Sequence, residues 1–81
     1  MFYTIKYATS HKDNNNIQVN FDKSGNKYVV SAWEKGEYKT VERVEYDRYE
    51  AAEIAFHAMC NKYNMFSVHE AKQTRGATDF D

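Results

Sequence analysis

The chain has 81 residues, a mass of 9.5 kDa and a formal net charge of −1. This length supports one small hydrophobic core, and the charge balance excludes the large acidic or basic excess of a polyanion mimic or a strongly basic nucleic-acid binder. The chain has no apolar run of the about 20 residues that a transmembrane helix needs. Its first residues lack the apolar segment of a signal peptide, and Cys60 is the one cysteine, so no intrachain disulfide can form. We therefore expect a cytoplasmic domain that has no membrane partner.

The composition and the hydrophobic pattern favour antiparallel β-structure. The chain lacks Leu and Pro but carries seven Tyr, five Phe and one Trp, which favour pleated surfaces. Short polar or glycine-containing segments, at 10–16, 22–25 and 35–36, predict a loop and two turns. Between them, apolar and polar residues alternate as in half-buried strands at 2–7, 17–21, 27–34 and 37–46. The pattern predicts a four-stranded meander.

A helix is predicted after the fourth strand. Asp47 and Glu50 form a capping-box pattern, which predicts that Asp47 caps a helix ending near Asn64. One polar stripe runs along this helix, and its remaining surface, which includes Ile54, should face the sheet. The stripe comprises Glu50, Glu53, His57 and Asn61.

The segment after the helix completes the predicted architecture. Residues 66–69 fit a short fifth strand. We therefore expect an α+β fold over residues 1–72, in which an antiparallel four-stranded β-meander is packed on one face by a single α-helix. Residues 73–81 are expected to form a flexible polar tail.

The hairpin loops decide which side chains share a sheet face. Three-residue loops with Gly25 and Gly36 in the left-handed conformation would place Val19 beside Val29 and turn Trp33 toward the helix. A loop one residue longer or shorter would exchange the two faces. With three-residue loops, the face away from the helix holds Tyr28, Val30, Ala32, Tyr38 and Thr40 beside Gln18 and Asn20.

The aromatic residues of the sheet support two interpretations. They are either ordinary cross-strand pairs on a hydrated face or a binding platform, because Tyr and Trp are enriched at protein interfaces and also stack on bases. The candidate partner-binding residues are Tyr28, Tyr38, Trp33, Val30, Gln18 and Asn20.

Catalytic and metal-binding motifs are weak. His57 and Cys60 have helical i, i+3 spacing, but a closed zinc site needs about four such ligands, and His11 and His69 lie far away in sequence. The simpler interpretation places His57 in solvent and Cys60 at the edge of the core. We expect no metal, no cofactor and no catalytic residue, and therefore a protein that is not an enzyme.

The order of elements resembles that of a small phage-encoded inhibitor. The segment Ile5-Lys6-Tyr7, the strand at 16–19, the Gly25 hairpin and the helix after Tyr46 resemble the layout of a type I-F anti-CRISPR protein. The resemblance covers about the first two-thirds of the chain. It implies stoichiometric binding to a host effector complex in the host cytoplasm instead of catalysis, and it carries over no site residues.

Two functions therefore compete. The first is a protein-binding inhibitor or adaptor encoded by a phage or another mobile element. The second is a nucleic-acid-binding module, in which Tyr28 and Tyr38 stack on bases. Its phosphate contacts would be Lys6, Lys23, Lys27, Lys39 and Arg43. Four nearby glutamates would cancel much of this positive field, which favours the first function. The identity of the partner and the oligomeric state stay open.

Overall fold

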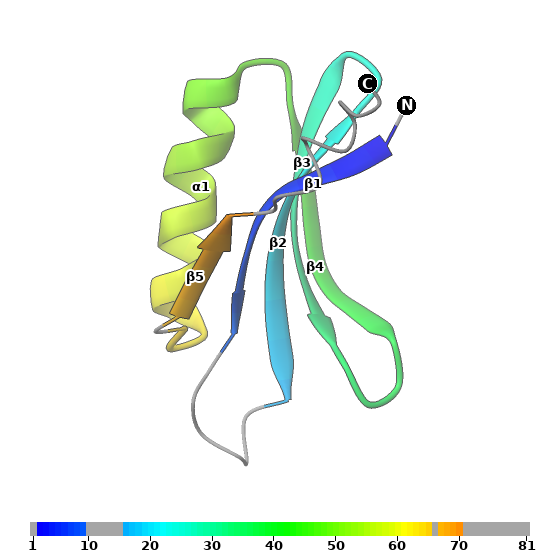
Figure 1. Cartoon of the computed structure of the whole chain (residues 1–81), viewed down its shortest axis with the longest axis vertical. Coiled ribbons are helices and arrows are strands. Elements are labelled where there is room, and N and C mark those ends of the chain that lie inside the picture. Colours follow the sequence, from blue (N-terminus) through cyan, green and yellow to red (C-terminus); the bar gives the residue numbers. More distant parts are fainter. Residues whose placement is uncertain (1, 10–15, 66, 71–81) are drawn as a thin grey trace.

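The computed structural model describes residues 2–9, 16–65 and 67–70 of the chain. In order, its elements are β1 (Phe2–Thr9), β2 (Ile17–Ser24), β3 (Lys27–Glu34), β4 (Lys39–Tyr46), α1 (Tyr49–Lys62) and β5 (Ser67–Glu70) (Figure 1). The five strands form one antiparallel sheet in the order β4-β3-β2-β1-β5. The predicted meander, helix and short fifth strand are confirmed. The predicted tail at 73–81 lies outside the described residues.

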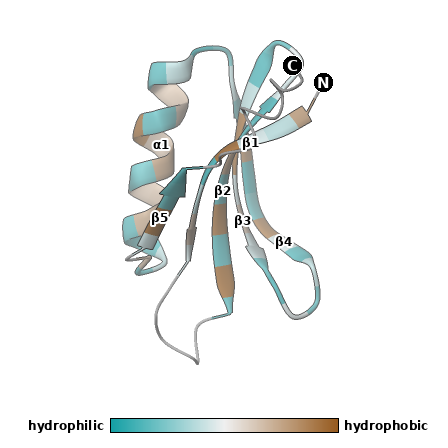
Figure 2. Ribbon diagram, viewed as in Figure 1, coloured by the Kyte–Doolittle hydropathy of each residue, from teal (hydrophilic) through white to brown (hydrophobic). Residues whose placement is uncertain are grey.

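The helix lies against one face of the sheet (Figure 1). It follows β4 at one edge of the sheet, and the chain then returns as β5 beside β1 at the other edge. Apolar and polar residues alternate along β2 (Figure 2), so that one side of this central strand can be buried beneath α1.

The hydrophobic core lies between α1 and the three central strands. The rings of Phe21 in β2 and Phe56 in α1 are both 0% exposed, and their centroids lie 5.9 Å apart. Burial of one such side chain contributes about 1.5–3 kcal/mol to folding. The other buried core residues are Ala8, Val19, Val30, Ala32, Ala52, Met59, Cys60 and Met65.

The expected register of β2 and β3 is wrong. Ser24 pairs with Lys27, so the hairpin has a two-residue loop, in which Gly25 has a φ of 60°. A glycine with positive φ at the first loop position is typical of a type II′ turn, whose twist suits a hairpin. Val19 therefore pairs with Ala32 instead of Val29. Because this shift is an odd number of residues, it turns every side chain of β3 to the other face.

The second hairpin also differs from the expectation. Its loop has four residues, 35–38, and the positive φ falls on Tyr38 (54°), not on Gly36. A Cβ atom at Gly36 would lie 2.7 Å from the Asn16 side-chain nitrogen, so a larger residue there would require the Asn16 side chain to shift. The backbone of the same region is tied together because the Lys35 amide donates to the Asn16 carbonyl over 2.9 Å.

Two expectations about the helix are wrong. Arg48 is the N-cap residue and its side chain makes no capping hydrogen bond, whereas Asp47 forms an ion pair with Lys27. The buried side of the helix is centred on Ala52 and Phe56, and Ile54 is 72% exposed. The wide apolar arc is compatible with several rotations of the helix about its axis. Packing of the large Phe56 ring against Phe21 accounts for the observed rotation.

Candidate functional site

The sheet face away from α1, here called the distal face, brings together four of the six predicted binding residues. Directly opposed residues in antiparallel strands share a face, and Gln18 pairs with Trp33. Asn20 lies two residues from Gln18 on the same strand and therefore on the same face. Tyr38 stacks on the Trp33 ring. Trp33, which was expected to point toward the helix, instead lies at the centre of this group.

The other two predicted binding residues lie on the helix side. Val30 is 0% exposed in the core, and Tyr28 is half-buried against it. The Tyr28 ring contacts the rings of Phe21 and Tyr49, with centroid distances of 6.2 Å and 5.6 Å. The expectation that they lie on the face away from the helix is wrong, and the cause is the two-residue turn at Gly25 that sets the face of β3.

A row of hydrogen bonds orders the polar side chains of the distal face. The Trp33 indole Nε1–H and the Gln18 amide both donate to Asn20 Oδ1, each over 2.9 Å. Asn20 Nδ2 in turn donates to Asp22 Oδ1 over 3.4 Å, and the Thr4 hydroxyl donates to the same oxygen over 2.8 Å. This row of hydrogen bonds holds the indole plane and the amide orientations in place.

The buried carboxyl group in this row was missed by sequence reasoning. Asp22 is 5% exposed, and burial raises the pKa of its carboxyl group, against the opposing effect of the hydrogen bonds from Thr4 and Asn20. Asp22 was assigned to the first turn because Asp is common there. Its pairing with Val29, inside the β2–β3 ladder, follows from the shorter loop.

Two aromatic stacks lie on this sheet, one between β3 and the loop that follows it and one between β1 and β5. Trp33 and Tyr38 have centroids 5.9 Å apart and planes inclined by 16°, and Tyr38 is 81% exposed. Tyr7 of β1 stacks on His69 of β5 at 4.9 Å, with planes inclined by 22°. Tyr7 pairs with Asn20, which places it on the distal face as well. The alternating pattern of β1 predicted that Tyr7 lies in a strand, but the contact of Tyr7 with His69 depends on the pairing of β5 with β1.

The backbone of Tyr38 is strained. A φ of 54° lies in the left-handed region, which costs a residue with a bulky side chain about 1–2 kcal/mol relative to ordinary conformations. Strained residues of this kind concentrate at binding and catalytic sites, where they aim a side chain. Here the strained residue carries the exposed ring that extends the Trp33 surface.

The basic residues proposed for nucleic-acid contacts are dispersed and mostly engaged. Lys6 pairs with Glu53 of the helix over 2.9 Å, and this hydrogen bond raises the pKa of the lysine and lowers that of the glutamate. Lys23 lies over the Tyr28 ring, with its Nζ 5.3 Å from the centroid. Lys27 pairs with Asp47 and Arg43 with Glu45, while Lys39 is exposed. These cations do not form a single field around the distal face.

The candidate metal and nucleophile residues lie in different environments. His57 is exposed on α1, whereas Cys60 is 5% exposed at the edge of the core. Burial raises the pKa of the Cys60 thiol to about 11, which suppresses the reactive thiolate at neutral pH. This agrees with a packing role for Cys60. His11 lies outside the described residues.

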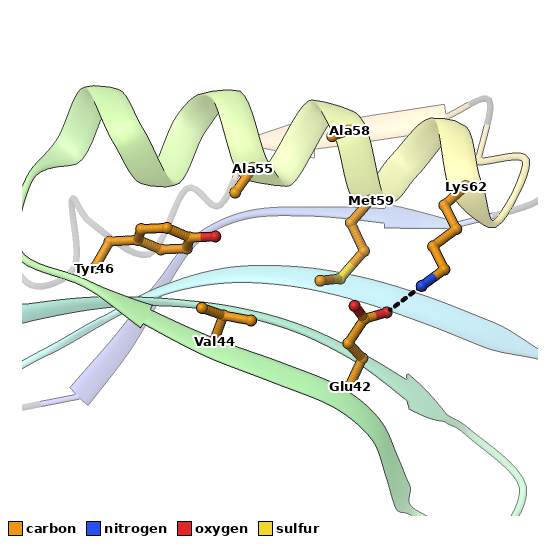
Figure 3. A pocket seen from close by; sticks show the side chains of 7 residues that line it. All are labelled: Glu42, Val44, Tyr46, Ala55, Ala58, Met59 and Lys62. Carbon is orange, nitrogen blue, oxygen red and sulfur yellow. Dashed lines mark hydrogen bonds and ion pairs between the residues drawn. The ribbon is translucent and has the colours of Figure 1, made fainter.

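A second surface feature lies between α1 and β4 (Figure 3). It is a groove of about 270 Å³, with Val44 and Tyr46 on the strand side and Ala55 and Met59 on the helix side. At one end, Glu42 accepts hydrogen bonds from Lys62 Nζ over 3.0 Å and from the Tyr63 hydroxyl over 2.9 Å. No local pattern predicts this groove, because its existence depends on which side of the helix packs against the sheet.

Within the described part of the chain, no helix has the length and apolar character needed to cross a membrane. Comparisons of the chain with protein-family models, with curated proteins and with solved structures found no match.

Proposed function

We propose that the protein is a small non-enzymatic binding module that acts by stoichiometric attachment of its distal face to a partner protein. The observation that carries this proposal is the Trp33–Tyr38 stack, whose outer ring is 81% exposed and is held by a strained backbone. Large, rigid aromatic side chains are the commonest hot spots of protein interfaces. Gln18 and Asn20 supply hydrogen-bonding groups beside this apolar surface.

The kind of partner is proposed from the same features and from the layout of the chain. A host or effector protein complex fits an exposed, preorganised sheet face better than a small-molecule substrate does, since small ligands favour enclosed pockets. The resemblance to phage-encoded inhibitors supports an inhibitor or adaptor role of this kind in the host cytoplasm. The nucleic-acid alternative has less support, because four of its five cations are engaged by carboxylates or by a ring.

Two exposed hydrophobic side chains provide a matched test of the proposed surface. Tyr38 is on the distal side, and Ile54, which is 72% exposed on α1, is the control. Tagged wild type, Tyr38→Ala and Ile54→Ala proteins would be used to capture proteins from candidate host lysates, with identification by mass spectrometry. The affinity of the purified captured complex would then be measured by calorimetry.

We expect Tyr38→Ala to weaken binding about 30-fold, as for an interface hot spot of about 2 kcal/mol, and Ile54→Ala to bind as the wild type does. Loss of binding in Ile54→Ala with full binding in Tyr38→Ala would contradict the proposal. Fluorescence anisotropy with a single-stranded oligonucleotide at low salt tests the alternative. Tight binding of the oligonucleotide that depends on Tyr38 would show that the partner of the distal face is a nucleic acid and not a protein.

A further inference from the structure

Strand β4 forms one edge of the sheet and pairs only with β3 among the described strands. From Glu42 to Tyr46, past the irregularity at Val41 in the pairing with β3, the backbone groups along its outer side are therefore open to a further strand. Its side chains are also accessible: Val41 is 49% and Val44 is 40% exposed. This edge spans eight residues, twice the length of β5 at the opposite edge.

The order of charges along β4 makes this edge complementary to itself in one register. Two copies of a strand can pair antiparallel about a two-fold axis perpendicular to the sheet, and residues at equal distances from the axis then face each other. An axis at Glu42, Arg43 or Glu45 places that charge against its own copy. An axis at Val41 places Lys39 against Arg43, which is also unfavourable, and an axis at Thr40 or Tyr46 brings no opposite charges of β4 together.

An axis at Val44 gives a different result. Val44 then faces Val44 of the second copy, and Arg43 faces Glu45 of the second copy at two symmetric positions. Within one chain, Arg43 Nη1 already lies 2.9 Å from Glu45 Oε2 on the distal face, and both side chains are about half exposed. The guanidinium has five N–H donors, so it can keep this contact and add another across the axis. On the helix face, Glu42 faces Tyr46 of the second copy.

We infer that two copies of the chain dimerise through their β4 edges in the register centred on Val44. The two five-stranded sheets become continuous, with both α1 helices on one side and both distal faces on the other. The grooves lined by Val44 and Tyr46 meet at the axis, so the exposed valine is covered by its own copy. The inference does not depend on the proposed partner, but the dimer would present that partner with two adjacent binding faces.

Sedimentation equilibrium from about 10 µM to about 1 mM protein tests association, because a single strand pair buries less than the roughly 1,600 Å² of a standard interface and should dissociate on dilution. We expect the mass to rise with concentration from 9.5 kDa toward twice that value. A mass of 9.5 kDa over the whole concentration range would overturn the inference. The charged residues of β4 would then serve to prevent pairing of this edge with another strand.

Two single charge reversals test the register. In Arg43→Glu, glutamates face each other across the axis, and in Glu45→Arg, arginines do. Each variant alone should dimerise at least about tenfold more weakly than the wild type. An equimolar mixture of the two variants should form heterodimers, because each glutamate of the Arg43→Glu chain then faces an arginine of the Glu45→Arg chain.

Circular dichroism would establish that both variants are folded, and the double exchange Arg43→Glu/Glu45→Arg, which keeps the composition and the pairing, should dimerise as the wild type does. Unchanged dimerisation of the single variants, or a mixture that stays monomeric, would refute the proposed register. None of these measurements uses the partner, so their failure would leave the Tyr38 binding test unaffected.

Discussion

The left-handed backbone of Tyr38 can be tested by comparing Tyr38→Gly with Tyr38→Ala. Both variants lose the stacking contact with Trp33, which contributes about 0.5–1.5 kcal/mol. Only glycine removes the strain of a φ of 54°, which is about 1–2 kcal/mol. Glycine also makes the unfolded chain more flexible, which costs about 0.4–1 kcal/mol relative to alanine. The sum predicts that Tyr38→Gly is more stable than Tyr38→Ala by about 0.5–1 kcal/mol and close to the wild type.

The free energies of unfolding would be measured by urea denaturation and checked by thermal melts, in which about 1 kcal/mol corresponds to about 4–8 °C. Glu37 is the control, because it is an exposed residue of the same loop without a positive φ. There, the alanine variant should be the more stable one. An alanine variant that is equal to or more stable than the glycine variant at position 38 would refute the strained conformation.

Four further predictions, at three residues, concern stability and reactivity. Burial raises the pKa of Asp22, so the contribution of this residue to stability is largest below pH 3.8, its ordinary pKa, and is lost as the pH rises through the raised pKa. Urea titrations should therefore show that Asp22→Asn is more stable than the wild type at pH 7. The stability of this variant should also depend less on pH. The Cys60 thiol should react with iodoacetamide at least about tenfold more slowly in the folded protein than in urea. Because its folded pKa is about 11, its contribution to stability should also be lost as the pH rises from about 9 toward 11, and Cys60→Ala should make the fall in stability over this range less steep. Arg48→Asp, which supplies the missing cap of α1, should raise the free energy of unfolding by about 0.5–2 kcal/mol, and an unchanged denaturation midpoint would place the start of the helix elsewhere.

The strands and the helix could be predicted because their signals are local. Alternation at Ile17, Val19 and Phe21 identifies β2 whatever its neighbours are, and a run of good helix formers from Ala51 onward identifies α1. The capping pattern was also local, but it failed: Asp47 is engaged by Lys27, a residue 20 positions earlier in the chain. Local patterns cannot predict such a distant competitor for a side chain.

The candidate site was only partly predictable, since it depends on register. Trp33, Gln18 and Asn20 were correctly predicted to lie in the sheet, whereas Tyr38 lies in the loop before β4, and the grouping of the four required the correct loop lengths. The two-residue turn at Gly25 moved Val30 into the core and brought Trp33 within hydrogen-bonding distance of Asn20. A difference of one residue between the expected and the observed length of this loop therefore reversed the face of every side chain in β3, because side chains alternate with a period of two.

The sequence alone determined that this chain forms an antiparallel meander, a helix and a short last strand, because these elements follow from hydrophobic period and turn residues. Tertiary structure decided the rotation of α1, which follows from how Phe56 packs against Phe21 and leaves Ile54 in solvent. It also decided that the groove opens beside β4 and that Tyr38 carries the positive φ. These features depend on contacts between residues far apart in the chain, and close packing selects one arrangement among several that the local patterns allow equally.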